Sequence, residues 1–293
     1  MDIKKLVLIC LIIVGAGSPL AIPQQAIAGQ DTSDAGHATI PDAGLFAGRM
    51  WGEVYSDAVS EQAQGYNIIG DLFVKQGLHL FKINGEYLDA YAKTRLNLDV
   101  DGNYFYNRWE NGIGLRYKPF RYYGLYVYAE YLLNSYLGRE LPDEPNPYAG
   151  HQLNAQGGLT FWQWWGKEGW QVRGPEYYLP FTGWREVYAD AIYYGNENNI
   201  VATLDYKEGL MLVPVGPVLF DAYIATQAGT DANGDPWYHF AEIGPGIRVK
   251  PFDNLDLQIS VEYFMGRYTR GGFGDTKAEI ADFEFTIAFW QGW

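Results

Sequence analysis

Cysteine is nearly absent from this chain of 293 residues, since Cys10 is the only one. It lies in the N-terminal segment 1–28, where Lys4 and Lys5 precede the apolar run LVLICLIIVGAG and the letters AIA stand before Gly29. This order is typical of a cleaved signal peptide. We therefore expect an exported mature chain that forms no disulfide.

A second long apolar run is also missing, because no later stretch reaches the 18 residues that indicate a transmembrane helix. Basic residues are few: 21 Lys and Arg stand against 35 Asp and Glu, for a net charge of −14. This balance argues against nucleic acid as a partner, because phosphates need a basic surface. Neither GxSxG nor HExxH occurs, so we expect a protein that is not an enzyme.

Aromatic residues and alternating strands are what the chain has in abundance. It contains 24 Tyr, 15 Phe and 10 Trp, and period-2 alternation follows a polar, flexible lead-in at 29–46. The pattern predicts twelve strands, at approximately 47–57, 66–82, 86–98, 103–118, 121–137, 151–166, 183–195, 199–212, 216–228, 236–251, 255–269 and 279–292.

Each of these strands has one apolar and one charged face. Leu257, Ile259 and Val261, for example, alternate with polar residues. A soluble sandwich shows the same alternation, but long strands with aromatic ends and the terminal Trp293 favour a membrane barrel. We therefore predict an all-β protein, an antiparallel transmembrane β-barrel of about 12 strands in the cell outer membrane.

The chain also repeats itself. The segment 112–136 aligns with 244–268 at an offset of 132 without a gap, and WGEVYSDAV at 51–59 returns as WREVYADAI at 184–192. This repetition predicts a single barrel domain at 47–293, built from two duplicated six-stranded halves. The halves would be 47–166 and 183–293, joined by a periplasmic connection at 167–182.

If the apolar faces look toward lipid, ionised side chains line the lumen. The expected acidic set is Glu53, Asp57, Asp89, Glu110, Glu130, Glu186, Asp190, Asp221, Glu242 and Glu262, and the expected basic set is Lys93, Arg95, Arg108, Arg116, Lys118, Arg248 and Lys250. Two interpretations stay open. The lumen is either a polar channel with a cation-leaning field, or a charge-paired interior that holds a narrow barrel rigid.

Two further groups of residues are candidates for ligand contact. Tyr126, Tyr128, Tyr188 and Tyr223 share the inward parity, and their rings are candidates for stacking on sugars. DVDGN and DANGD supply oxygen ligands at alternate positions beside Gly, namely Asp99, Asp101, Asn103, Asp231, Asn233 and Asp235. Such ligands suit calcium, although Asx-Gly is also common hairpin-turn chemistry. We expect no cofactor, with calcium as the alternative.

The stretches WREVYADAIYY, GIRVKPF and LQISVEYFMGRY carry a resemblance. They resemble the C-terminal outer-membrane barrel domain of the bacteriophage adsorption protein A family and, more loosely, exopolysaccharide-export barrels. The predicted barrel implies outer-membrane lipid as a partner, and the resemblance adds polysaccharide and periplasmic export proteins. We expect passage or export of a polar solute, a saccharide or exopolysaccharide. The alternative is a closed surface barrel that phage or partner proteins recognise through its outer loops.

Overall fold

The computed structural model describes residues 49–61, 67–100, 107–121, 123–137, 151–166, 182–195, 197–212, 218–235, 238–252, 256–268 and 279–292. The expected signal peptide, the lead-in, the connection at 167–182 and Trp293 lie outside these ranges, except that Thr182 begins a strand. Twelve strands are present: β1 (Met50–Glu61), β2 (Asn67–Ile83), β3 (Glu86–Asp99), β4 (Arg108–Tyr117), β5 (Gly124–Tyr136), β6 (His151–Gly166), β7 (Thr182–Tyr194), β8 (Asn199–Met211), β9 (Leu219–Asp231), β10 (Phe240–Lys250), β11 (Asp256–Tyr268) and β12 (Glu279–Gly292).

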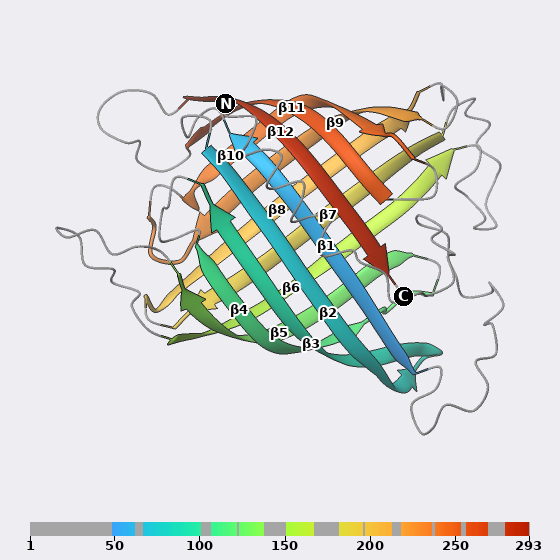
Figure 1. Ribbon diagram of the computed structural model, residues 1–293, viewed down its shortest axis with the longest axis vertical. Helices are drawn as coiled ribbons and strands as arrows, with labels where there is room; N and C mark the ends of the chain where they lie inside the picture. Colours follow the sequence, from blue (N-terminus) through green and yellow to red (C-terminus); the bar gives the residue numbers. More distant parts are fainter. Residues whose placement is uncertain are drawn as a thin grey trace.

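The strands form one closed antiparallel barrel in which each strand pairs with its neighbours in sequence. β1 closes the barrel against β12, with Glu53 opposite Gly292 and Glu61 opposite Glu284. Closure leaves no strand edge without a partner, as a membrane requires. The strands cross the barrel obliquely in Figure 1. We name the rim where β1 begins and β12 ends the terminal rim, and the opposite one the loop rim.

Alternate side chains point to opposite faces of each strand, and the two faces differ in chemistry. Large apolar side chains cover the outer wall, where Ile113 is 67% and Ile247 58% exposed. Carboxylates of the opposite parity, such as those of Glu130 and Glu262, are buried inside. Among the described residues no helix is long and apolar enough to cross a membrane. A closed barrel with an apolar outer wall and an ionised interior is an outer-membrane β-barrel.

The strand boundaries differ from the sequence pattern at a few places. β1 extends to Glu61 instead of ending at 57, because its pairing with β2 continues to Glu61 opposite Asn67. β9 likewise extends to Asp231 instead of 228, since Val201 of β8 still pairs with Asp231. β2, which alternates least cleanly, is a continuous strand with an irregular register between His79 and Phe81. A bulge there explains why its alternation weakens.

Candidate functional site

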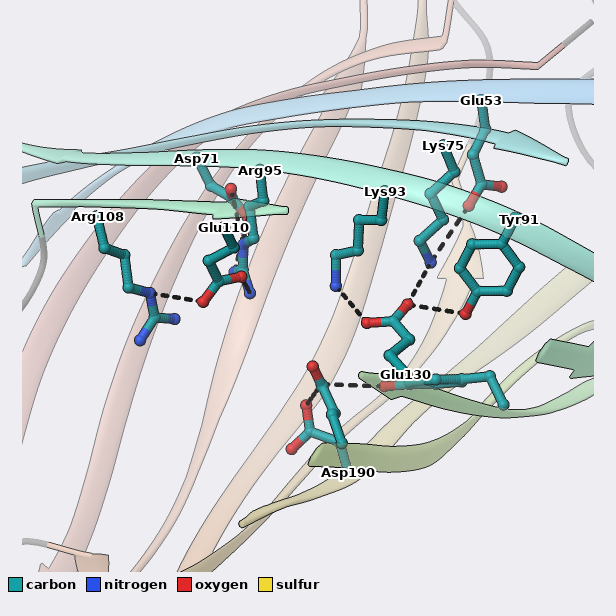
Figure 2. Close-up of polar contacts among 12 residues, drawn as sticks. Glu53, Asp71, Lys75, Tyr91, Lys93, Arg95, Arg108, Glu110, Glu130 and Asp190 are labelled. Atoms are coloured by element: carbon teal, nitrogen blue, oxygen red, sulfur yellow. Dashed lines mark hydrogen bonds and ion pairs between the residues drawn. The ribbon is translucent and has the colours of Figure 1, made fainter. Parts of the chain in front are cut away.

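The lumen of the first half contains an ionic cluster centred on Glu130 of β5. Its carboxylate accepts a hydrogen bond from Lys93 Nζ at 2.7 Å and one from the Tyr91 hydroxyl at 2.8 Å. Lys75 Nζ lies 3.5 Å from it and 3.4 Å from Glu53. Figure 2 shows these side chains converging from different strands. Because β2 and β5 are not neighbours in the sheet, these contacts brace the wall from inside.

Arg116 of β4 extends this cluster toward the terminal rim. Its guanidinium lies 3.4 Å from Glu53 and 3.3 Å from Asp89. It also stacks on the Trp51 ring, with Cζ 3.6 Å from the ring centroid. Asp89 has a second neighbour, since His79 Nδ1 lies 2.6 Å from it. Arg116 is therefore held by charge and by cation–π contact together.

The second half contains a matching cluster centred on Glu262 of β11. Lys207 and the hydroxyl of Tyr223 each contact Glu262 Oε1 at 2.5 Å. Arg248 lies 2.8 Å from Asp221 and 3.0 Å from Glu186, and it stacks on Trp184 with Cζ 3.8 Å from the centroid. Glu130, Lys75, Tyr91, Arg116 and Asp89 lie 132 positions before their counterparts, and Glu53 and Trp51 lie 133 before theirs.

Apart from Lys93, whose counterpart is Ala225, the two clusters place the same residue types at positions that the sequence repeat equates. The prediction that the chain arose by duplication is compatible with this geometry and stays a prediction.

Glycines make room for the rings of both clusters. A Cβ on Gly114 would lie 2.5 Å from the Tyr91 ring, and one on Gly246 would lie 2.4 Å from the Tyr223 ring. Gly77 and Gly209 give the same clearance to Trp51 and Trp184. These four glycines therefore make room for inward aromatic side chains that lie across the neighbouring strand.

Nearer the loop rim, the first half has a second tier of paired charges. Arg95 donates to Asp71 at 2.8 Å and lies 3.8 Å from Glu110. Arg108 Nε lies 2.9 Å from the same Glu110, whose side chain is buried. Figure 2 shows both arginines directed at this acidic pair. Asp57 accepts a hydrogen bond from Tyr55 at 2.8 Å.

The corresponding tier of the second half contains acids without basic partners. Asp190 accepts hydrogen bonds from Gln156 at 2.8 Å and from Thr203 at 2.6 Å. None of the basic side chains in the described ranges forms a salt bridge with Asp190, Asp205 or Glu242. Tyr188, beside Asp205 in the β7–β8 register, is 47% exposed although its parity is inward. This tier therefore faces open space in the lumen.

The remaining predicted residues occupy several different environments. Tyr223 is buried and bonded to Glu262, so its ring offers no open face. Tyr126 lies under Arg116 and Lys118, at 4.9 and 5.9 Å from its centroid. Gln156 Nε2 lies 3.4 Å from the Tyr128 hydroxyl. Lys250 pairs with Asp256 at 3.2 Å. Among the four tyrosines predicted to stack on sugars, Tyr188 has the most open ring.

The calcium candidate at 231–235 has the contacts of a turn. Asp231 accepts hydrogen bonds from the backbone N–H groups of Asn233 and Gly234, and Gly234 has a positive φ of 83°. Its carboxylate also contacts Asn199 Nδ2 at 2.8 Å and His239 Nε2 at 2.7 Å. In the part of the chain that the structure describes, no three His, Cys, Asp or Glu side chains are grouped to hold a metal. Asp101 and Asn103 lie outside that part.

Sequence reasoning did not single out Trp51 and Trp184. Both lie near strand starts, where aromatic residues are expected at the membrane interface, yet Trp184 is completely buried inside the lumen. Trp164 packs against the same inner cluster. The signal that identifies these tryptophans is the repeat itself, because WGEVY and WREVY align Trp51 with Trp184.

Comparisons with known proteins return outer-membrane barrels of low similarity. The β domain of the Bordetella autotransporter BrkA is 12% identical, with a TM-score of 0.34 over 82% of this chain and 98% of that one. A bacterial polysaccharide outer membrane secretin is 10% identical, with a TM-score of 0.36 over 82% and 98%. Outer-membrane expressed OmpT of Vibrio cholerae is 10% identical, with a TM-score of 0.33 over 83% and 97%. No protein-family model and no curated protein matches the chain.

Proposed function

We propose that the barrel is a passage for a polar solute, a saccharide or an exopolysaccharide, across the outer membrane. The observation that carries this proposal is the open space in the lumen beside β7 and β8. There Tyr188 and Thr203 point inward and are exposed. Hydroxyl, carboxylate and amide groups next to an accessible aromatic ring offer both hydrogen bonds and a stacking surface to a sugar.

The two ionic clusters set the bore of this passage. They occupy opposite arcs of the barrel, β1–β5 and β7–β11. In the first arc three acids lie among three bases, whereas in the second Glu186, Asp221 and Glu262 share only Lys207 and Arg248. The fixed side chains narrow the lumen, and the second arc keeps one negative charge in excess. A solute would therefore pass between two rigid walls, and its selection would occur in the tier nearer the loop rim.

Single-channel conductance of the purified barrel in a planar lipid bilayer tests the proposal. We expect discrete conductance steps, and addition of a permeating sugar should reduce them. Changing Glu130 and Glu262 to Gln should alter step size and open-state noise, because each carboxylate holds a lysine and a tyrosine in place. Absence of conductance at every voltage would remove passage as the function.

A closed receptor barrel is the second candidate, and the burial of the first-half charges favours it. Glu110, Glu130 and Lys93 are nearly inaccessible, as expected of an interior that stabilises a barrel and does not conduct. In that case phage or partner proteins would recognise the outer surface. Binding to intact cells would then persist in variants whose lumen charges are removed.

A further inference from the structure

The inward positions from the level of Lys93 to the loop rim differ in charge between the halves, and most differences have one direction. Three basic residues of the first half have uncharged counterparts in the second: Lys93, Arg95 and Arg108 correspond to Ala225, Gln227 and Phe240. Three uncharged residues of the first half have acidic counterparts: Phe73, Asn154 and Gln156 correspond to Asp205, Asp282 and Glu284. Two differences run the other way, since Asp71 corresponds to Thr203 and Glu61 to Tyr194.

These differences leave one acid of the second half, Glu242, without the basic partners that its counterpart Glu110 has. Glu110 lies between Arg95 and Arg108 at 3.8 and 2.9 Å. The equivalent Glu242 forms no salt bridge with any described residue, although its side chain is half-buried. Burying a carboxylate without a cation is unfavourable. An acid that is kept after its partners are replaced therefore points to a cation supplied from outside the protein.

The strand register places these acids along one path around the wall. Asp205 of β8 is opposite Gln227 of β9, and Gln227 is opposite Glu242 of β10. Asp190 of β7 is opposite Thr203, two positions from Asp205 on the same strand. We name Asp190, Asp205 and Glu242 the acidic lane. It runs over four neighbouring strands and does not converge on one point.

Two buried oxygen atoms beside the acidic lane also lack a hydrogen-bond donor. Gln156 of β6 is more than nine-tenths buried and donates through Nε2 to Asp190, yet its Oε1 has no hydrogen-bond partner. Asp205 Oδ1 is likewise buried and without a partner. Both atoms are acceptors, so the group that satisfies them must be a donor. No metal-binding group of acids occurs among the described residues, which favours an organic cation over a metal ion.

We propose that the acidic lane recognises a solute that carries a protonated amine, such as an amino sugar. An ammonium group has three donors and can bind one carboxylate of the lane after another; beside Asp190 the Gln156 carbonyl oxygen is a further acceptor, and the exposed Tyr188 ring adds a cation–π face. The amine also accounts for the retained charge of Glu242. This inference rests on the proposed passage function and adds to it the chemical class of the solute.

The test compares the block of single-channel current by glucosamine with that by glucose, in the unmodified barrel and in Gln227→Arg. The substitution places an arginine opposite Glu242, as Arg95 lies opposite Glu110 in the first half. Gln227→Met is the control, because its side chain has a similar size and no charge. We expect glucosamine to block at a concentration at least about tenfold lower than glucose. Gln227→Arg should remove most of this difference, and Gln227→Met should keep it. If Gln227→Arg does not fold, the pair Asp205→Asn and Glu242→Gln gives the same comparison.

The possible outcomes separate the two proposals. A barrel that never conducts overturns the passage function. A barrel that conducts, but in which glucosamine and glucose block equally, leaves passage intact and overturns the acidic lane. Block by calcium ions without any effect of glucosamine also overturns the inference, because the lane would then hold a metal. Preference for glucosamine that disappears in Gln227→Arg supports it.

Discussion

The two halves of the lumen share one tier and differ in the other. Near the terminal rim, both halves place an arginine on a tryptophan between two carboxylates, and a glutamate beside a lysine and a tyrosine. Nearer the loop rim, the first half pairs Asp71 and Glu110 with Arg95 and Arg108. In the second half, Asp205 and Glu242 form no salt bridge with a described residue. Every acid of the shared tier contacts a base, which suits a structural role. The divergent tier sets the chemistry of the lumen.

The shared tier still differs between halves in how many partners each acid has. Glu53 contacts Lys75 as well as Arg116, and Asp89 contacts His79 as well as Arg116. Their counterparts Glu186 and Asp221 form their salt bridges, among the described residues, with Arg248 alone. Arg248 should therefore contribute more to the free energy of unfolding than its counterpart Arg116 does, and this difference can be measured.

The largest effect is expected from Arg248→Ala. Removing the guanidinium leaves Glu186 and Asp221 inside the barrel without a cation, and such losses cost about 3–5 kcal/mol. Arg116→Ala should cost less, about 1–2 kcal/mol, because Lys75 and His79 remain beside its two acids. Urea unfolding of the barrel in lipid vesicles measures both free energies.

Arg248→Lys is the control for this pair, since it keeps the charge and loses the planar stack on Trp184. It should lie between the unmodified barrel and Arg248→Ala. Equal losses for Arg116→Ala and Arg248→Ala would show that the extra partners of Glu53 and Asp89 contribute nothing.

Substitution of the glycines beneath the two tyrosines should cause the next largest loss of stability. Gly246→Val places a branched side chain where a Cβ alone would be 2.4 Å from the Tyr223 ring, and Gly114→Val does the same to Tyr91 at 2.5 Å. Overpacking of this kind costs about 1–3 kcal/mol. We expect similar losses in both halves, because the ring geometry is the same. The folded fraction of unheated samples on gels measures them, and a loss in only one half would contradict the equivalence.

The sequence predicts the barrel well because one physical rule governs all of its strands. Each strand must present one face to lipid and the other to the lumen, so parity alone predicts that Glu130 and Arg116 point inward. The repeat adds their correspondence with Glu262 and Arg248. The number of strands, the side chains expected to point inward and the outer-membrane location all follow from this local pattern.

Contacts across the lumen could not be read from the pattern. Lys75 reaches Glu130 from a strand three places away, and Arg116 reaches Glu53 in the same way. Such contacts depend on barrel radius and strand stagger, which no single strand encodes. Trp184 was missed for a related reason: its place near a strand end predicts the membrane interface, whereas its parity directs it inward under Arg248.

A smaller loss of stability is expected for Lys93, because the second half folds without a lysine at the equivalent position. Lys93 donates to Glu130, but its counterpart Ala225 is fully buried in a hydrophobic cluster with Trp184, Tyr223 and Phe264. Lys93→Ala should therefore cost only about 1 kcal/mol, because Lys75 and Tyr91 still contact Glu130. Urea unfolding measures this change, and Lys75→Ala is its matched comparison. A loss above about 3 kcal/mol would mean that the two clusters are not interchangeable.

The smallest effect is expected at the loop rim, where His239 and Asn107 occupy equivalent positions. His239 contacts Asp231, while Asn107 accepts a hydrogen bond from the backbone N–H of Asp99 at 3.0 Å. In His239→Asn, Asp231 keeps its bonds from Asn199 and from the backbone of Gly234. The cost should thus stay below about 1 kcal/mol by urea unfolding. Asp231→Ala should lower the free energy of unfolding clearly more, since it removes every one of these bonds. Equal losses for the two variants would mean that Asp231 stabilises the turn through His239 alone.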